Sequence, residues 1–320
     1  MLSFLLQGQY RVQSRRQYSL STLKGEWYCE QGLVSNEEIN SQLSKHLQWL
    51  GTNQVKLRAA LITKRSGKFH EEPDILYKRE FFIPASHSEP MTVDIVDVLK
   101  SKRKWFERLG STQKLFTNET CQYVLNKLLK LELIIAKEYV FHEAGHFIGY
   151  DIYAKQKDNY FCAAGKTVWP LIYLEELRAD LNAFGFAAQM LPAEQAAQSF
   201  LYNIFLRFGG HYHGMLTTLN APYGIVPYLL FCLLIEFEII TVVRKQNCYS
   251  LHIKKANSEH IIESMRICAK HAEIELNAIE IKLSNPIDRA IAAAKYIKSR
   301  LNKKEFIKEY ALIMDIKKDD

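Results

Sequence analysis

The alternation of apolar and polar residues changes character near residue 115. Before it, short runs alternate the two kinds of side chain, as in residues 55–66 and 75–86, and glycine and proline separate the runs. This pattern predicts strands joined by turns. After it, apolar residues recur every three to four positions over long stretches, which predicts helices. We therefore expect a predominantly helical α+β fold, with a small mixed α/β N-terminal region (residues 1–115) and a large helical region (residues 116–320).

Polar and proline-containing breaks divide the predicted helices. The longest stretch begins at Thr117 or Asn118 and has no proline for more than 35 residues, so a break near Leu131 is expected. The last part of the chain has amphipathic helices broken at Asn285-Pro286. The other predicted helices are residues 36–50, 171–190 and 192–208.

The segment Ile225–Val243 is almost continuously apolar and nearly long enough to cross a membrane. It contains Pro227, Glu236 and Glu238, and carboxylates near one end of such a segment are costly in lipid. We therefore predict a helix buried in the protein core, with no firm membrane association. Contact of this segment with a membrane is the alternative.

Composition and charge exclude several classes of protein. The 320 residues are 48% hydrophobic and 24% charged, which is ordinary for a globular protein and argues against disorder. The net charge of +7 is modest, and its basic clusters are typical of solvated helix faces. No nucleic-acid-binding motif accompanies these clusters, so no nucleic-acid partner is expected. Nothing in the sequence indicates the oligomeric state.

The cysteines and the N-terminus bear on location. The six cysteines are dispersed without a CxxC pair, which is typical of reduced thiols in the cytoplasm. The N-terminus carries Arg11, Arg15 and Arg16 and has no acidic residue before Glu26, a composition similar to that of a transit peptide. The expected location is the cytoplasm, with organelle targeting by the Arg-rich N-terminus as the alternative.

The candidate chemistry begins at residues 142–146, His-Glu-Ala-Gly-His, inside the first long helix. Two histidines four residues apart are separated by about 40° around a helix, so both project from one face. A single tetrahedral Zn²⁺ can accept His142 and His146 together. Glu143 lies beside the first histidine, where it can reach a water molecule at the metal and act as a general base.

A catalytic zinc takes three protein ligands, and the third lies about thirty residues downstream. Glu176 and Asp180 are four residues apart on a predicted helix and share a face. Glu176 is the candidate ligand, and Asp180 can accept the free ring N–H of a ligating histidine. Glu175 is rotated away by about 100° and is expected to contribute little. The alternative is that Glu175 is the ligand and Asp180 a surface charge. Ala179 and Ala183 are small enough for the two helices to approach closely.

Glu143 and His146 also form the Glu-x-x-His unit that di-iron helical bundles use twice. No other histidine of the chain has a glutamate three residues before it, so a di-iron site is not favoured.

The two motifs together resemble those of the gluzincin zinc metallopeptidases, of which thermolysin is the type. The resemblance implies a zincin-like catalytic part. It also implies three zinc ligands, namely His142, His146 and Glu176. In the same way it implies that Glu143 activates water and that Asp180 orients a ligand histidine.

Residues 175–180, Glu-Glu-Leu-Arg-Ala-Asp, are also similar to the second motif of the dipeptidyl peptidase III family. In that family the second glutamate is the ligand, which favours Glu176 over Glu175. The family's first motif has one more residue before its second histidine, and its chains are much longer. The resemblance covers residues 141–181.

Residues 209–214, Gly-Gly-His-Tyr-His-Gly, supply candidate hydrogen-bond donors to the substrate carbonyl oxygen, which becomes negatively charged during the reaction. The three donors are His211, Tyr212 and His213, which follow a predicted helix end and have glycines on both sides. A loop with surface histidines is the alternative.

The sequence predicts a zinc-dependent hydrolase that cleaves a peptide or amide bond, with Zn²⁺ as its cofactor and a peptide or small amide as its substrate. Two alternatives stay open. One is a metal-dependent enzyme acting on a specialised small molecule rather than a peptide. The other is a helical interaction protein in which the histidine motif is incidental.

Overall fold

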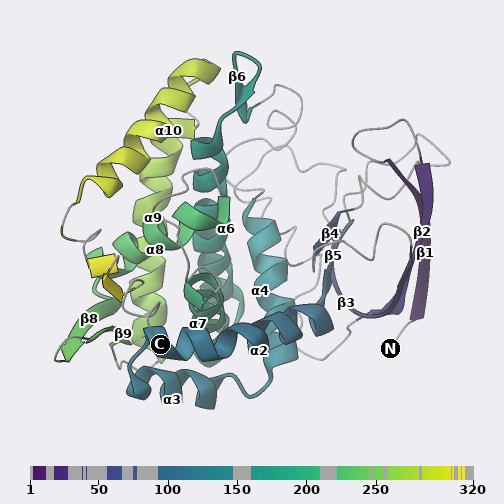
Figure 1. Cartoon of the computed structure of the whole chain (residues 1–320), viewed down its shortest axis with the longest axis horizontal. Coiled ribbons are helices and arrows are strands. Elements are labelled where there is room, and N and C mark those ends of the chain that lie inside the picture. The colour runs from purple at the N-terminus through teal and green to yellow at the C-terminus, as the bar shows by residue number, and fades with distance from the viewer. Residues whose placement is uncertain are drawn as a thin grey trace.

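The computed structural model describes most of the chain. The residues described are 3–11, 18–27, 38, 41, 56–66, 75–77, 93–146, 160–209, 222–245, 248–254, 258–280, 283–303, 305, 309–310 and 312–313. Helices dominate these residues, so the predicted α+β, predominantly helical fold is confirmed. The N-terminal strands gather at one end of the molecule, and helices make up most of the rest (Figure 1).

A five-stranded sheet forms the N-terminal end. Its strands are β1 (Ser3–Arg11), β2 (Tyr18–Trp27), β3 (Lys56–Ser66), β4 (Ile75–Tyr77) and β5 (Val93–Asp97). Their order is β1-β2-β3-β5-β4, and neighbours are antiparallel except for the parallel pair β3–β5. The strand predicted over residues 55–66 is confirmed as β3. The run 75–86 is described only where β4 forms, and the predicted helix at 36–50 lies almost wholly outside the described residues.

The first two strands were not predicted. β1 and β2 pair in antiparallel register from Ser3 opposite Glu26 to Arg11 opposite Tyr18. Their residues alternate only weakly between apolar and polar, and the strand preference of such a segment depends on its neighbours in the sheet. The sequence pattern alone therefore gave no signal for them.

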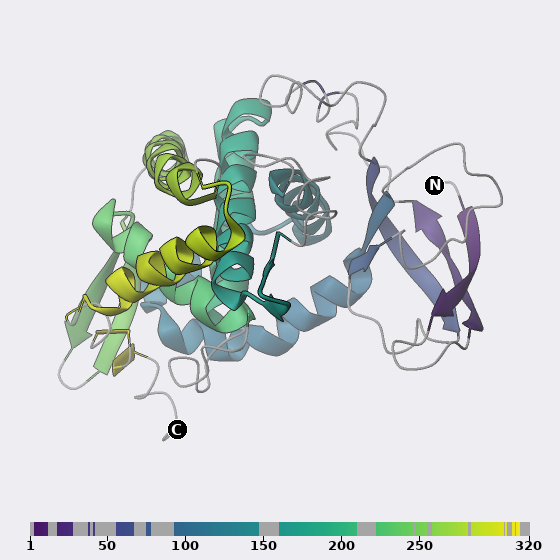
Figure 2. The ribbon, with the colours of Figure 1, turned by 90° about the horizontal axis from the view of Figure 1, so that it is seen from above.

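The helix α2 (Val98–Leu115) connects the sheet to the helical part. It begins where β5 ends, and the side chain of Asp97 accepts the backbone N–H of Lys100 at 3.1 Å. Figures 1 and 2 show α2 running from the sheet along the helical part, where it packs against α4 and α7. This helix was not predicted because dense basic residues interrupt its apolar stripe. The proposed division at residue 115 falls at its end and stays a prediction.

The helical part is built around a central helix, α6 (Trp169–Met190), which packs against several other helices of the described part of the chain. These are α4 (Leu131–Gly145), α7 (Ala193–Gly209), α8 (Pro222–Glu236), α9 (Ser258–Glu280) and α10 (Pro286–Leu301). The predicted break near Leu131 is confirmed, since α3 (Asn118–Lys127) ends before it and α4 begins at it. The break at Asn285 is confirmed too, because its side chain accepts the backbone N–H of Ile287 at 2.8 Å and caps α10. A short hairpin, β6 (Cys162–Ala163) with β7 (Lys166–Thr167), precedes α6.

The apolar segment Ile225–Val243 forms a buried helix only in its first part. Residues 225–234 of α8 are all buried, as predicted. After Glu236 the chain turns, with Glu238 at a φ of 54°, and continues as β8 (Ile240–Lys245), which pairs with β9 (Cys248–Ile253). The hairpin was missed because a run of apolar residues does not distinguish a buried helix from a buried strand. Among the described residues, no helix has both the length and the apolar character needed to cross a membrane.

Candidate metal centre

The helices α4 and α6 approach each other closely where the histidine motif ends. A Cβ atom at Gly145 would lie 2.6 Å from the backbone oxygen of Ala179 and 2.9 Å from its Cα. Real Cβ contacts are not this short, so glycine is the residue that lets the two backbones meet. The small side chain of Ala179 was expected to allow this approach. The amide of Asn182 adds a hydrogen bond to the Gly145 carbonyl at 3.3 Å.

Gly145→Ala is expected to destabilise the protein by about 1–3 kcal/mol, because the added methyl group would overpack the contact between the two backbones. The free energy of unfolding, measured by denaturant titration, checks this. Gly185→Ala is the matched control, since a Cβ at Gly185 in α6 meets nothing within 4 Å. That control should be neutral or stabilising by about 0.5–1 kcal/mol. Equal stability of the two variants would contradict the close contact.

The structure brings the three predicted ligands together. One donor atom each from His142, His146 and Glu176 lies within 4.8 Å of the other two. Nε2 of His142 is 3.7 Å from Oε2 of Glu176. In a tetrahedral zinc site with bonds of about 2.0–2.1 Å, ligand atoms are about 3.3 Å apart. Small side-chain movements therefore suffice to close these three donors around one ion.

Asp180 orients the first histidine. Its Oδ1 lies 2.9 Å from Nδ1 of His142. An ionised carboxylate only accepts hydrogen bonds, so Nδ1 carries a proton, and Nε2 on the side of Glu176 is the nitrogen left for a metal. Asp180 is completely buried, which excludes the alternative in which it is a surface charge.

Glu175 orients the second histidine, a role different from the minor one expected from its direction on the helix. Its Oε1 lies 3.2 Å from Nδ1 of His146, which leaves Nε2 of that ring for a metal. Adjacent residues of a helix differ by about 100° in direction. Glu175 can therefore reach Nδ1 of His146 while Glu176 faces the metal position. Each imidazole thus has its own carboxylate partner, as metal-ligating histidines usually do.

The third wall of the site comes from α7, which no motif had indicated. Asn203 donates to Oε1 of Glu138 at 2.7 Å and to Oδ1 of Asp180 at 3.0 Å. Arg207 donates two hydrogen bonds to Asp180, each 2.8 Å long. Asn203 and Arg207 are four residues apart, so they share a helix face. In the otherwise apolar or aromatic stretch 200–208 these two polar residues stand out, but the sequence does not show which way they point.

Burial and charge set the protonation of the site. Burial raises the pKa of Glu138 and of Glu143. Burial would also raise the pKa of Asp180, but Arg207 and His142 hold it well below its usual range. Burial alone would lower the pKa of His142, yet the hydrogen bond to Asp180 and the nearby carboxylates raise it to about 9. Carboxylates therefore surround both imidazoles, and their negative charge favours a cation at the position between the two rings.

Glu143 lies inside this arrangement. It is only 4% exposed, and its carboxyl group interacts electrostatically with His146, His142 and Glu176. Of the predicted site residues, Glu143 thus lies with the ligands, whereas His211, Tyr212 and His213 lie outside the described residues. Their role as oxyanion donors stays a prediction.

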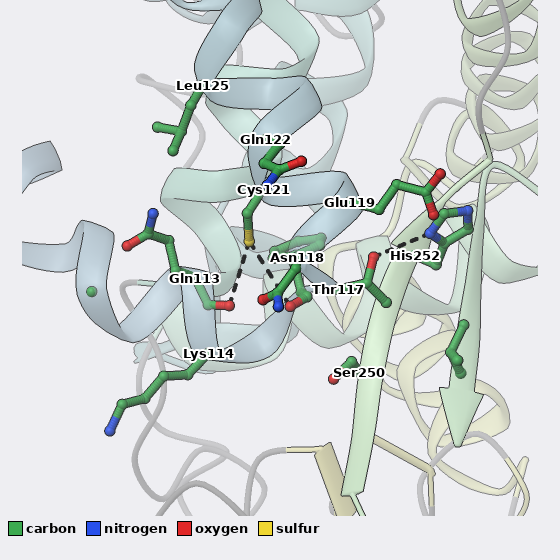
Figure 3. Close-up of a pocket in the computed structure, with 13 residues that line it drawn as sticks. Gln113, Lys114, Thr117, Asn118, Glu119, Cys121, Gln122, Leu125, Ser250 and His252 are labelled. Atoms are coloured by element: carbon green, nitrogen blue, oxygen red, sulfur yellow. Dashed lines mark hydrogen bonds between the residues drawn. The ribbon is translucent and has the colours of Figure 1, made fainter. Parts of the chain in front are cut away.

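A separate cavity of about 1010 Å³ opens between α3 and the β8–β9 hairpin (Figure 3). Two of its titratable groups take part in local contacts: Nδ1 of His252 lies 3.1 Å from Oγ1 of Thr117, and the Cys121 thiol donates to the Gln113 carbonyl at 3.4 Å. None of the residues that line it belongs to the metal-binding group. The cavity is therefore distinct from the candidate metal centre.

No model of a known protein family matches the chain, and no curated protein matches it in sequence. Among solved structures, the dipeptidyl peptidase III of Caldithrix abyssi matches with a TM-score of 0.59 and 12% identity, over 99% of this chain and 59% of that one. The two chains share a fold. The dipeptidyl peptidase III of Corallococcus sp. strain EGB matches with a TM-score of 0.46 and 13% identity, over 97% of this chain and 61% of that one. The chain thus spans about three fifths of these proteins.

Proposed function

We propose that the protein is a zinc-dependent hydrolase that cleaves a peptide or amide bond. The observation that carries the proposal is the convergence of His142, His146 and Glu176. Nδ1 of each histidine is hydrogen-bonded to a carboxylate. Two imidazoles and one carboxylate are the ligand set of catalytic zinc sites that keep one position open. The donors fit Zn²⁺, whereas a hard cation such as Mg²⁺ prefers a site made of oxygens.

Bound zinc would supply a more acidic water and an electrophile for the substrate carbonyl. The residues of the chain do the rest. Asp180 and Glu175 keep a proton on Nδ1 of His142 and of His146, so that Nε2 of each ring is directed to the metal position. Glu143 takes the proton of the attacking water and passes it to the leaving amine. Burial raises the pKa of the Glu143 carboxyl group, which makes it a stronger acceptor for the proton of the water.

A peptide is the favoured substrate. The fold is shared with a dipeptidyl peptidase III, and residues 175–180 resemble the second motif of that same family. Incubation with a mixed peptide library, followed by mass spectrometry, tests this directly. We expect cleavage that stops when a chelator is added and returns when zinc is restored. A zinc-loaded protein that cleaves no peptide in the library would favour the alternative, a hydrolase of a specialised small molecule.

We keep two further parts of the proposal from the sequence. His211, Tyr212 and His213 remain the proposed donors to the substrate oxyanion, because such a charge needs a donor besides the metal. The dispersed cysteines favour a cytoplasmic location.

A further inference from the structure

One largely buried arginine outside both motifs contacts two carboxylates of the site. Arg207 lies near the end of α7, and its side chain is 12% exposed. Its Nε donates to Oδ2 of Asp180 and its Nη2 donates to Oδ1. Nη2 also lies 3.5 Å from Oε2 of Glu176. A single guanidinium thus contacts the proposed metal ligand and the carboxylate that orients His142.

The hydrogen bonds to Asp180 leave it little capacity to bind a metal. It accepts two from Arg207, one from Nδ1 of His142 and one from the amide of Asn203. An ionised carboxylate offers about four acceptor positions in total. Three of these hydrogen bonds end on Oδ1 and the fourth, from Nε of Arg207, ends on Oδ2, so both oxygens of Asp180 are engaged by donors of the protein.

The surroundings of His142 contain two groups that could hold a cation. The first is His142, His146 and Glu176, and the second is Glu138, His142 and Asp180. Both include His142, and a neutral imidazole has one nitrogen free to bind a metal, so an ion in one group excludes an ion in the other. An ion in the second group would need free oxygens on Asp180 and would lie close to the positive charge of Arg207, and like charges repel.

We propose that Arg207 is a positioning residue that assigns the two carboxylates different roles. It keeps Asp180 as the hydrogen-bond partner of His142, and so directs the metal to the side of Glu176. This inference rests on the proposed function, since it concerns where the zinc of that function binds.

The test compares metal binding by the intact protein and by Arg207→Met. Zinc affinity is measured by competition with a chromophoric chelator, and the ligand set is followed by the visible absorption of the Co²⁺-loaded protein. We expect zinc affinity to fall about tenfold or more, the range seen when the partners of ligating groups are removed. The Co²⁺ bands should shift, because Asp180 becomes available to the metal. Arg207→Lys should also bind zinc more weakly than wild type, since an ammonium group cannot bond both carboxylate oxygens in the same fork.

Arg300→Met is the matched control. Arg300 is a buried arginine that pairs with Glu236 and Glu275, neither of which belongs to the metal-binding group. Its loss should lower the melting temperature and leave zinc affinity and the Co²⁺ spectrum unchanged.

An Arg207→Met protein that melts earlier but keeps the wild-type zinc affinity and Co²⁺ spectrum would show a structural role only and overturn the inference. If that variant does not fold, Arg207→Lys decides on the same two readouts, and wild-type values there overturn it. A wild-type protein that binds neither zinc nor Co²⁺ would instead refute the proposed function, and the inference with it. The two failures are therefore distinguishable.

Discussion

Glu143→Gln is expected to abolish hydrolysis while leaving the fold and the bound zinc intact. Glutamine has nearly the same shape as glutamate, but its amide cannot take a proton from the attacking water. Loss of a general base lowers the rate by about 10² or more. Turnover of a peptide identified in the library assay, measured with zinc content and melting temperature on the same sample, checks this prediction.

The stability of this variant should not fall much. Glu143 is almost completely buried, and burial raises its pKa because the charged form is disfavoured there. A neutral amide avoids this desolvation. Glu132→Gln is the control: Glu132 belongs to the same helix but forms an ion pair with Lys102 at the surface, 2.7 Å away. It should keep wild-type turnover. If Glu143→Gln also kept it, Glu143 would not be the base.

Glu176→Ala is expected to lose most of the bound zinc, because it removes one of three protein ligands. Asp180→Ala and Glu175→Ala should lose less, with metal affinity reduced by about 10–100-fold, because each removes the partner of one histidine rather than a ligand. Zinc titration of the three single variants gives the order. The structure thus raises the expected effect of Glu175→Ala above what the sequence indicated.

A control for general loss of negative charge is Glu194→Ala. Glu194 lies in the first turn of α7 and pairs with Lys127 at the surface, 2.7 Å away. Its removal should leave zinc affinity unchanged. An order in which Glu175→Ala is the most damaging variant would show that Glu175 is the ligand and would overturn the assignment of Glu176.

The sequence was most informative where one helix carries the whole signal. The boundaries of α6 and α7 follow from an apolar period and from Pro192, and the spacing of His142 and His146 requires only helix geometry. The placement of Glu176 needed one assumption, that two helices with small residues pack together. The contact between Gly145 and Ala179 shows how closely they do.

The sequence was least informative where the partner lies far along the chain. Glu175 and Glu176 are neighbours, and only the position of α4 decides which of them meets His146. Arg207 is 27 residues beyond Asp180, and nothing local shows that α7 turns this side chain toward the site. The strands β1 and β2 depend in the same way on their pairing with each other rather than on their own pattern.

The most direct test of the central claim is the zinc content of the purified protein, determined by elemental analysis without added chelator. We expect about one zinc per chain in the wild type, because two histidines and one glutamate form a three-ligand site. We expect full zinc in Glu143→Gln and much less than one zinc in His142→Ala. Equal metal in the wild type and in His142→Ala, or no zinc in the wild type, would contradict the central claim.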